Sequence, residues 1–194
     1  MIRILLMLIA IVLVFSCTAQ EEINSDKLIY KNGVMYAPDA DEPYTGNAYS
    51  GYPNGKIFTE VPYKNGLTNG CSITYFEDGK IQTREDYKDG KYHGIVLSYY
   101  SNGNMESSLT YSEDYMNGLA TYYFENGKKH SEGLYNDCKH VGNWTYYYDN
   151  GKIKKVGSYT DAQEHGLWKY FSEEGNLTKK VIFDQGEIVT TKNP

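Results

Sequence analysis

The sequence has no cluster of basic residues. Its 194 residues include 19 lysines and arginines against 25 aspartates and glutamates, which gives a formal net charge of -6. Neutralisation of phosphates by Lys and Arg supplies most of the affinity of proteins for nucleic acids. We therefore expect no nucleic-acid partner.

Catalytic and metal-binding motifs are also missing. The sequence has no P-loop, no GxGxxG motif and no Ser-His-Asp arrangement. His93 and His165 precede a glycine at positions where other parts of the chain have asparagine, which is typical of a turn. His130 and His140 flank one segment of the chain, without cysteines or carboxylates at metal-site spacing. We therefore expect no enzyme activity, no metal and no cofactor.

Large apolar side chains are scarce apart from tyrosine. The chain has 21 Tyr and 19 Gly but only 6 Phe and 2 Trp, and its mean hydropathy is -0.60. Such a chain must bury tyrosine rings while their hydroxyls stay hydrated or hydrogen-bonded. Thin sheets and solenoids satisfy this condition, because each element contacts only its neighbours.

The apolar run at residues 4–15 is too short to cross a bilayer as a helix, which needs about 20 residues. It follows Arg3 and ends at Ser16-Cys17, which resembles a bacterial lipobox. We predict a lipoprotein signal peptide at residues 1–16, lipid attachment at Cys17 and a linker at 17–26. The membrane would then be a partner through the lipid, in the bacterial cell envelope (outer membrane, periplasmic or surface face). An ordinary cleaved signal peptide is the alternative.

Two further cysteines, Cys71 and Cys138, are separated by almost three copies of the repeat described next. About six strands at ~4.8 Å would place them roughly 25–30 Å apart. A disulfide requires Cα atoms within ~7 Å. We predict two free thiols.

Tyrosine and glycine recur with a period of 24 residues, which is the signature of a repeat protein. Six copies run over 39–62, 63–86, 87–110, 111–134, 135–158 and 159–182, and 183–190 begins a seventh, so that the repeat domain spans 39–190. Residues 27–38 are predicted to form a capping hairpin, and 191–194 a tail. The repeat-initial rings are Tyr63, Tyr87, Tyr111, Tyr135, Tyr159 and Phe183. The structural glycines of the repeat are Gly70, Gly94, Gly118, Gly142 and Gly166, and Gly79, Gly103, Gly127 and Gly151.

Each copy is predicted to be a β-hairpin. Asp78-Gly79 and Asn102-Gly103 suit a two-residue type I′ turn, which needs φ > 0 at both positions. That turn places Phe76 opposite Ile81, Thr74 opposite Thr83, Tyr100 opposite Met105, and Tyr87 opposite Gly70. An aromatic ring lying over a strand glycine covers exposed backbone. We predict an all-β fold, an elongated antiparallel sheet of stacked hairpins.

Alternation of side chains along the strands assigns the two faces. The repeat-initial rings and the rings before each turn (Tyr52, Phe76, Tyr100, Phe124, Tyr148) belong to the predicted packed face. The second face is expected to be half-exposed and polar on its second strand, with Gln82, Glu106, His130 and Lys154. The candidate binding residues are Tyr75, Tyr99, Tyr123, Tyr147, Phe171, Trp144 and Trp168. Simple cross-strand pairing of tyrosines is the alternative role for most of these positions.

The repeat unit, shown best by residues 142–152 with their Gly-Asn-Trp-Thr-Tyr-Tyr-Tyr-Asp-Asn-Gly-Lys sequence, resembles the bacterial variant of the MORN repeat. Chains of this kind are commonly catalogued as YwqK-family antitoxins. The resemblance implies an elongated sheet used as a scaffold or binding platform. The chain departs from the pattern at Asp39, where tyrosine is expected, and at Ser172, where a ring is expected.

Three functions follow as hypotheses. The first is a non-enzymatic cell-envelope lipoprotein that serves as a scaffold for an unidentified protein partner. The second is binding of a glycan or of the cell wall through exposed Tyr and Trp rings. The third is an antitoxin of a toxin–antitoxin pair, as the resemblance implies, although export to the envelope conflicts with neutralising a cytoplasmic toxin.

Overall fold

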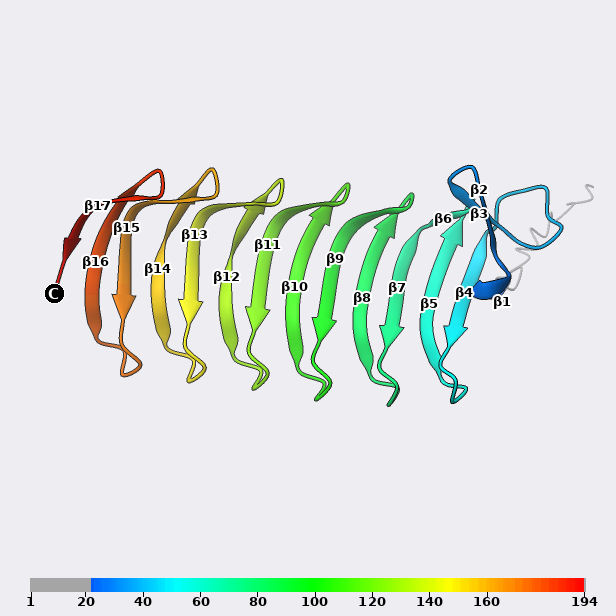
Figure 1. Ribbon diagram of the computed structural model, residues 1–194, viewed down its shortest axis with the longest axis horizontal. Helices are drawn as coiled ribbons and strands as arrows, with labels where there is room; N and C mark the ends of the chain where they lie inside the picture. Colours follow the sequence, from blue (N-terminus) through cyan, green and yellow to red (C-terminus); the bar gives the residue numbers. More distant parts are fainter. Residues whose placement is uncertain (1–21, 194) are drawn as a thin grey trace, which may run out of the picture.

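The protein, in a computed structural model that describes residues 22–193, is an open all-β sheet of stacked hairpins, as predicted (Figure 1). The main sheet has 15 strands, and from β4 onward neighbouring strands run antiparallel. Its strands after the N-terminal segment are β4 (Gly46–Gly51), β5 (Ile57–Lys64), β6 (Leu67–Thr68), β7 (Gly70–Tyr75), β8 (Ile81–Lys88), β9 (Lys91–Tyr99), β10 (Met105–Ser112), β11 (Tyr115–Tyr123), β12 (Lys129–Asn136), β13 (Lys139–Tyr147), β14 (Ile153–Thr160), β15 (Gln163–Phe171), β16 (Leu177–Asp184) and β17 (Glu187–Lys192). The predicted signal peptide and Cys17 lie outside the described residues.

Four short elements cover the first edge of the sheet. Strand β1 (Glu22–Asn24) pairs in parallel with β4, and a 3-10 turn η1 (Ser25–Lys27) follows it. The prediction of a plain linker up to residue 26 is therefore wrong for the part that β1 and η1 occupy. Strands β2 (Ile29–Lys31) and β3 (Val34–Tyr36) form a separate hairpin. The N–H of Met35 donates to the carbonyl of Gly66 at 2.9 Å, which joins this hairpin to the main sheet.

The hairpins have two kinds of turn, and the sequence-based assignment of the first kind is wrong. In the turn after β7, the N–H of Gly79 donates to the carbonyl of Phe76, and the N–H of Phe76 donates to the carbonyl of Lys80, each at 2.8 Å. Of the loop residues only Gly79 has positive φ, at 93°. This is a three-residue loop that ends in a glycine bulge, because a type I′ turn would need φ > 0 at the residue before glycine too.

Type I′ turns occur at the opposite edge instead, between the hairpins. Asp89 and Gly90 have φ of 50° and 83° and separate the paired residues Lys88 and Lys91. Glu113-Asp114, Asp137-Cys138 and Asp161-Ala162 adopt the same conformation without any glycine. The second residue of such a turn also bonds to the preceding copy, as when the N–H of Gly90 donates to the carbonyl of Thr68 at 2.8 Å.

The predicted pairing is confirmed along the body of each strand and wrong beside the turn. Thr74 is opposite Thr83, and Tyr87 is opposite Gly70, as expected. The same tyrosine–glycine register recurs in the following copies. Ile81 is opposite Tyr75 rather than Phe76, and Met105 is opposite Tyr99 rather than Tyr100. A β-bulge beside each three-residue loop absorbs the extra residue and restores the register.

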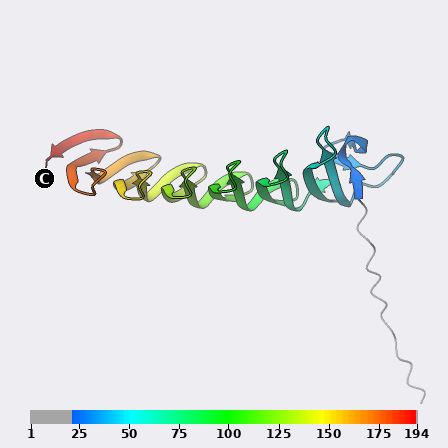
Figure 2. The same ribbon diagram turned by 90° about the horizontal axis from the view of Figure 1, so that it is seen from below.

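Figure 2 looks along the strands and shows one layer, so that both faces of the sheet meet solvent. The best-buried group is at the end formed by the last copies, where Trp168, Val181 and Phe183 pack with Tyr146, Tyr159 and Tyr170. Each hairpin therefore depends on side chains of its sequence neighbours for burial, as in other repeat proteins.

Candidate functional site

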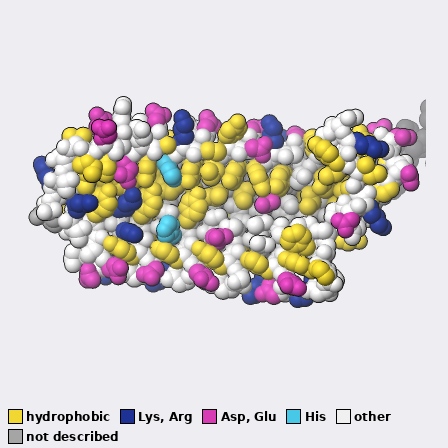
Figure 3. Space-filling model, in the orientation of Figure 1, with side chains coloured by type: hydrophobic (Ala, Val, Ile, Leu, Met, Phe, Trp, Pro, Cys, Tyr) yellow, Lys and Arg dark blue, Asp and Glu magenta, His cyan; other side chains and the backbone are white. Residues whose placement is uncertain are grey.

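A row of aromatic rings runs along one face of the sheet, which we call the ring face; it carries the repeat-initial rings from Tyr63 to Phe183. Between successive repeat-initial rings lies one residue from the start of the next hairpin. Tyr92 lies between Tyr87 and Tyr111, with centroids 4.6 and 5.2 Å away. Figure 3 shows the resulting apolar band along the length of the molecule. The predicted packing of the repeat-initial rings on one face is confirmed.

Trp144 and Trp168 are part of this packing and do not lie on an exposed binding face. They are 1% and 0% exposed, so that their proposed role in a ladder of exposed rings is wrong. Their indole N–H groups donate to the carbonyls of Leu134 and Ser158, both at 3.1 Å. Trp144 covers Gly133, and Trp168 covers Gly157.

Gly133 and Gly157 were not predicted from the sequence. Both lie outside the two series of repeat glycines, at a strand position where other copies have Glu85, Leu109 and Val181. Each stands 11 residues before a tryptophan, and this coincidence is the signal that would have revealed the pairing. Gly142 and Gly166 are paired with Tyr159 and Phe183 as expected, and nothing lies within 4 Å of a Cβ added at either glycine.

One ion pair interrupts the apolar part of the ring face. The Lys155 ammonium lies 2.9 Å from the Glu164 carboxylate and 4.6 Å from the centroids of both the Tyr146 and Trp168 rings. The hydroxyls of Tyr146 and Tyr159 are 3.0 Å apart. Burial, with a further contribution from this hydrogen bond, raises the pKa of Tyr146. These contacts keep polar groups paired within an aromatic cluster.

His140 occupies the same kind of position between two repeat-initial rings. Its centroid lies 4.7 Å from that of Tyr135 and 4.9 Å from that of Tyr159, and it meets Trp144 edge-on at 4.3 Å. Burial lowers the pKa of His140, because a charged imidazolium is less stable there. His140 is therefore a packing residue of the ring face.

The opposite face carries an exposed aliphatic stripe, defined by Ile95, Leu119, Leu134, Leu167 and Ile182, which are 39–57% exposed. Leu119 is directly opposite Leu134, and Leu167 directly opposite Ile182, so the members of each pair share this face. The predicted binding residues Tyr75, Tyr99, Tyr123, Tyr147 and Phe171 lie on the first strands of their hairpins and are partly buried. The aliphatic residues of the stripe are more exposed than these rings and were not predicted from the sequence.

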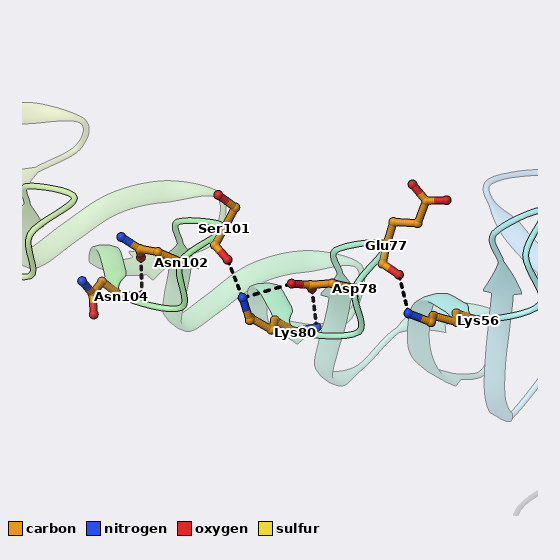
Figure 4. A network of polar contacts seen from close by, with 7 residues as sticks. All are labelled: Lys56, Glu77, Asp78, Lys80, Ser101, Asn102 and Asn104. Carbon is orange, nitrogen blue, oxygen red and sulfur yellow. Dashed lines mark hydrogen bonds and ion pairs between the residues drawn. The ribbon is translucent and has the colours of Figure 1, made fainter.

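Contacts between copies line the edge that carries the three-residue loops. The hydroxyls of Tyr52, Tyr100 and Tyr148 donate to the carbonyls of Tyr75, Tyr123 and Phe171 at 2.7–2.8 Å. Figure 4 shows the polar part of the same edge: the ammoniums of Lys56 and Lys80 donate to the carbonyls of Glu77 and Ser101 in the next copy, both at 2.9 Å. These repeated bonds hold successive loops in line.

The β-bulges change which side chains meet at this edge. His130 was assigned to the face opposite Phe124, yet the two rings are in edge-to-face contact with centroids 4.8 Å apart. Lys154, also assigned to the opposite face, has its ammonium 5.5 Å from the Tyr148 ring centroid. Two grooves with volumes of about 320 and 250 Å³ lie beside these contacts.

Within residues 22–193 no group of three or more His, Cys, Asp or Glu side chains is placed to hold a metal ion. Cys71 and Cys138 are free, as predicted. His130 and His140 make contacts with different rings. The part of the chain that the structure describes contains no helix with the length and apolar character to cross a membrane.

The chain was compared with curated proteins, solved structures and protein-family models. No curated protein matches the chain. A crystal structure of a porin-like protein from Bacteroides uniformis ATCC 8492 matches over 80% of this chain and 90% of its own, with 11% identity and a TM-score of 0.24, a likeness too low to bear on fold or function. The MORN repeat variant model matches six segments, 44–65, 68–89, 92–113, 116–137, 141–161 and 164–185, each of which ends at the first residue of a turn with positive φ. With six such repeats over more than half of its length, the chain belongs to the MORN repeat variant family.

Proposed function

We propose that this protein is a non-enzymatic lipoprotein of the bacterial cell envelope that presents its sheet to a protein partner. The aliphatic stripe is the observation that carries the proposal. Exposed apolar patches of this kind mark interaction sites on soluble proteins. Five large aliphatic side chains at 39–57% exposure lie along one face and are interrupted by the paired polar residues Asn143 and Ser158, an arrangement that suits a partner lying along the sheet.

The interaction is tested by placing a charge on the stripe. Leu119→Glu and Ile182→Glu each add one carboxylate at an exposed position, so the folded protein should lose little stability. A partner that docks on the stripe would have to desolvate the added charge, which weakens binding. Thr178→Glu, an exposed change on the same strand as Ile182, is the matched control. We expect a stoichiometric protein to co-purify with the wild type and the control and to be lost from the stripe variants. Equal recovery of the partner with the wild type, the control and both stripe variants would rule out the stripe as the docking surface.

The membrane anchor is proposed from residues 1–17 and needs its own test. Cys17→Ser removes the thiol that would carry the lipid, and membrane affinity from acylation would disappear with it. The expected result is release of the protein into the soluble fraction after cell lysis, with loss of the lipid mass. Retention of Cys17→Ser in the membrane fraction would refute lipidation at this residue.

A further inference from the structure

The two grooves at the edge with the three-residue loops are related by the repeat. One lies between Tyr100 and Phe124, the other between Phe124 and Tyr148, and both include His130. Five residues that line the first groove have counterparts 24 residues later in the second: Tyr100, Glu106, Tyr123, Phe124 and His130 correspond to Phe124, His130, Tyr147, Tyr148 and Lys154. Phe124 is thus a shared wall between two equivalent sites.

The walls of these grooves are fixed by contacts to the neighbouring copies at Tyr100 and Tyr148, and by a contact within its own copy at Phe124. The hydroxyls of Tyr100 and Tyr148 are held at 2.8 Å by the carbonyls of Tyr123 and Phe171. Phe124 has no hydroxyl and makes an edge-to-face contact with the His130 ring. Rings already fixed before binding lose little side-chain entropy when a ligand enters.

The spacing of the grooves selects a ligand conformation. Equivalent points one copy apart are separated by two strands, or ~9.6 Å at ~4.8 Å per strand. Three residues of polyproline II helix advance ~9.3 Å and return to the same side of the helix. Three residues of an extended strand advance a similar ~9.9 Å, but the first and last side chains point to opposite faces. An α-helix returns to nearly the same side after seven residues, which advance ~10.5 Å and drift from the grooves by about 1 Å per copy.

The charges of the grooves complement a basic ligand. Glu106, Asp149 and Glu173 line the grooves, and none of them makes an ion pair within residues 22–193. The one ammonium in the lining, that of Lys154, lies over the Tyr148 ring. All three residues are exposed, so water solvates their carboxylates in the free protein, and an arginine or lysine beside the docked residues would pair with them.

We infer that the grooves between Tyr100, Phe124 and Tyr148 bind a polyproline II segment of a protein partner, with prolines three residues apart and a basic residue beside them. Aromatic-lined grooves that receive such segments exploit a ligand that is ordered before it binds. The inference rests on the proposed role in binding a protein and adds a second contact, separate from the aliphatic stripe.

The spacing is tested with three synthetic peptides and the full-length protein in mild detergent. The first has prolines at i, i+3 and i+6 with a flanking arginine, the second has the same composition with prolines four residues apart, and the third has glycine in place of proline. Isothermal titration should show saturable binding of the first peptide, at least about tenfold tighter than either of the others. Equal affinities, or no binding, would overturn the inference.

The site is tested with paired variants. Phe124→Ala removes the shared wall, and Phe76→Ala makes the same change two copies earlier, outside both grooves. Asp149→Lys, with Glu77→Lys as its counterpart in another copy, tests the charge without altering a ring. We expect Phe124→Ala and Asp149→Lys to lower the affinity for the first peptide at least about fivefold. The two control variants should bind that peptide with an affinity within about twofold of the wild type.

Two other results separate this inference from the proposed function. A polysaccharide that binds with sensitivity to Phe124→Ala, while the first peptide does not bind, would assign the grooves to a glycan and overturn the inference. If Leu119→Glu loses a protein partner and the first peptide does not bind, the groove assignment is overturned. The proposed function would then still stand.

Discussion

Trp144 covers Gly133 of the neighbouring strand so closely that a Cβ added to Gly133 would lie 2.2 Å from Cδ2 of the indole. Trp168 and Gly157 repeat this relationship at 2.1 Å in the next copy. In a sheet of one layer, an indole that packs against the backbone of a glycine buries both its own surface and that of the strand. The two pairs therefore provide burial where a second sheet would provide it in a sandwich.

Gly133→Ala should destabilise the protein, because the methyl group and the indole cannot occupy the same space. Overpacking of this kind costs about 1–3 kcal/mol, and urea unfolding would measure it. Gly142→Ala is the matched control: its Cβ meets nothing within 4 Å, and the only cost is its φ of 62°. In the Trp144→Ala background, Gly133→Ala should become nearly neutral. A neutral Gly133→Ala in the wild type would contradict the packing described.

Ala162→Gly should stabilise the protein. Ala162 is the second residue of a type I′ turn and has φ of 66°, a conformation that L-residues other than Asn and Asp rarely adopt. Relief of this conformation, less the greater freedom of glycine in the unfolded chain, leaves a gain of about 0.5–1 kcal/mol. Ala120→Gly, at a buried position within strand β11, should destabilise instead. A lower melting temperature for both variants would argue against strain at Ala162.

Phe76→Tyr should stabilise the contact between successive copies, and Tyr100→Phe should weaken it. The hydroxyls of Tyr52, Tyr100 and Tyr148 each reach a carbonyl of the next copy, and Phe76 occupies the same repeat position. One such hydrogen bond contributes about 1 kcal/mol. Chemical denaturation of the two variants should show opposite shifts of the midpoint. Shifts of the same sign would mean that this hydroxyl does not join the copies.

Stability should fall in mild acid through His140. Burial lowers its pKa below the ordinary value of 6.5, so the unfolded chain binds a proton more readily than the folded one. The contribution of neutral His140 is therefore present above pH 6.5 and lost as pH falls through the lowered pKa. Met116 fills the equivalent position in the preceding copy, which makes His140→Met the matched variant. The difference in denaturation midpoint between the wild type and His140→Met should change between pH 8 and pH 5. A constant difference would contradict the assignment.

The repeat made the strands and their register predictable. Tyr87 was placed opposite Gly70 by extending the register of the assumed turn, and the pairing holds because the β-bulge restores that register. Hairpins of equal length then repeat it. The turns were less predictable, because Asn-Gly suits both a type I′ turn and a three-residue loop with a glycine bulge. At Asp161-Ala162 only the aspartate suits φ > 0, and the alanine, with φ of 66°, gives no sign of its conformation in the sequence.

The candidate site was predicted only in part. Alternation assigned the repeat-initial rings to one face, but burial within a single layer depends on which rings cover which backbone. Trp144 is buried because Gly133 lies beneath it, a relationship between two strands that alternation along one strand does not reveal. His130 reaches Phe124 because a bulge interrupts the alternation at that point.

Site-specific photo-cross-linking in intact cells tests the central claim, that a protein partner docks on the aliphatic stripe, most directly. A photoreactive amino acid would replace Leu119 on the stripe or, as a control, the exposed loop residue Glu77, which lies outside both grooves. We predict that irradiation gives one discrete protein adduct from position 119 and none from position 77. The absence of an adduct at position 119, or the same adduct from both positions, would contradict the claim.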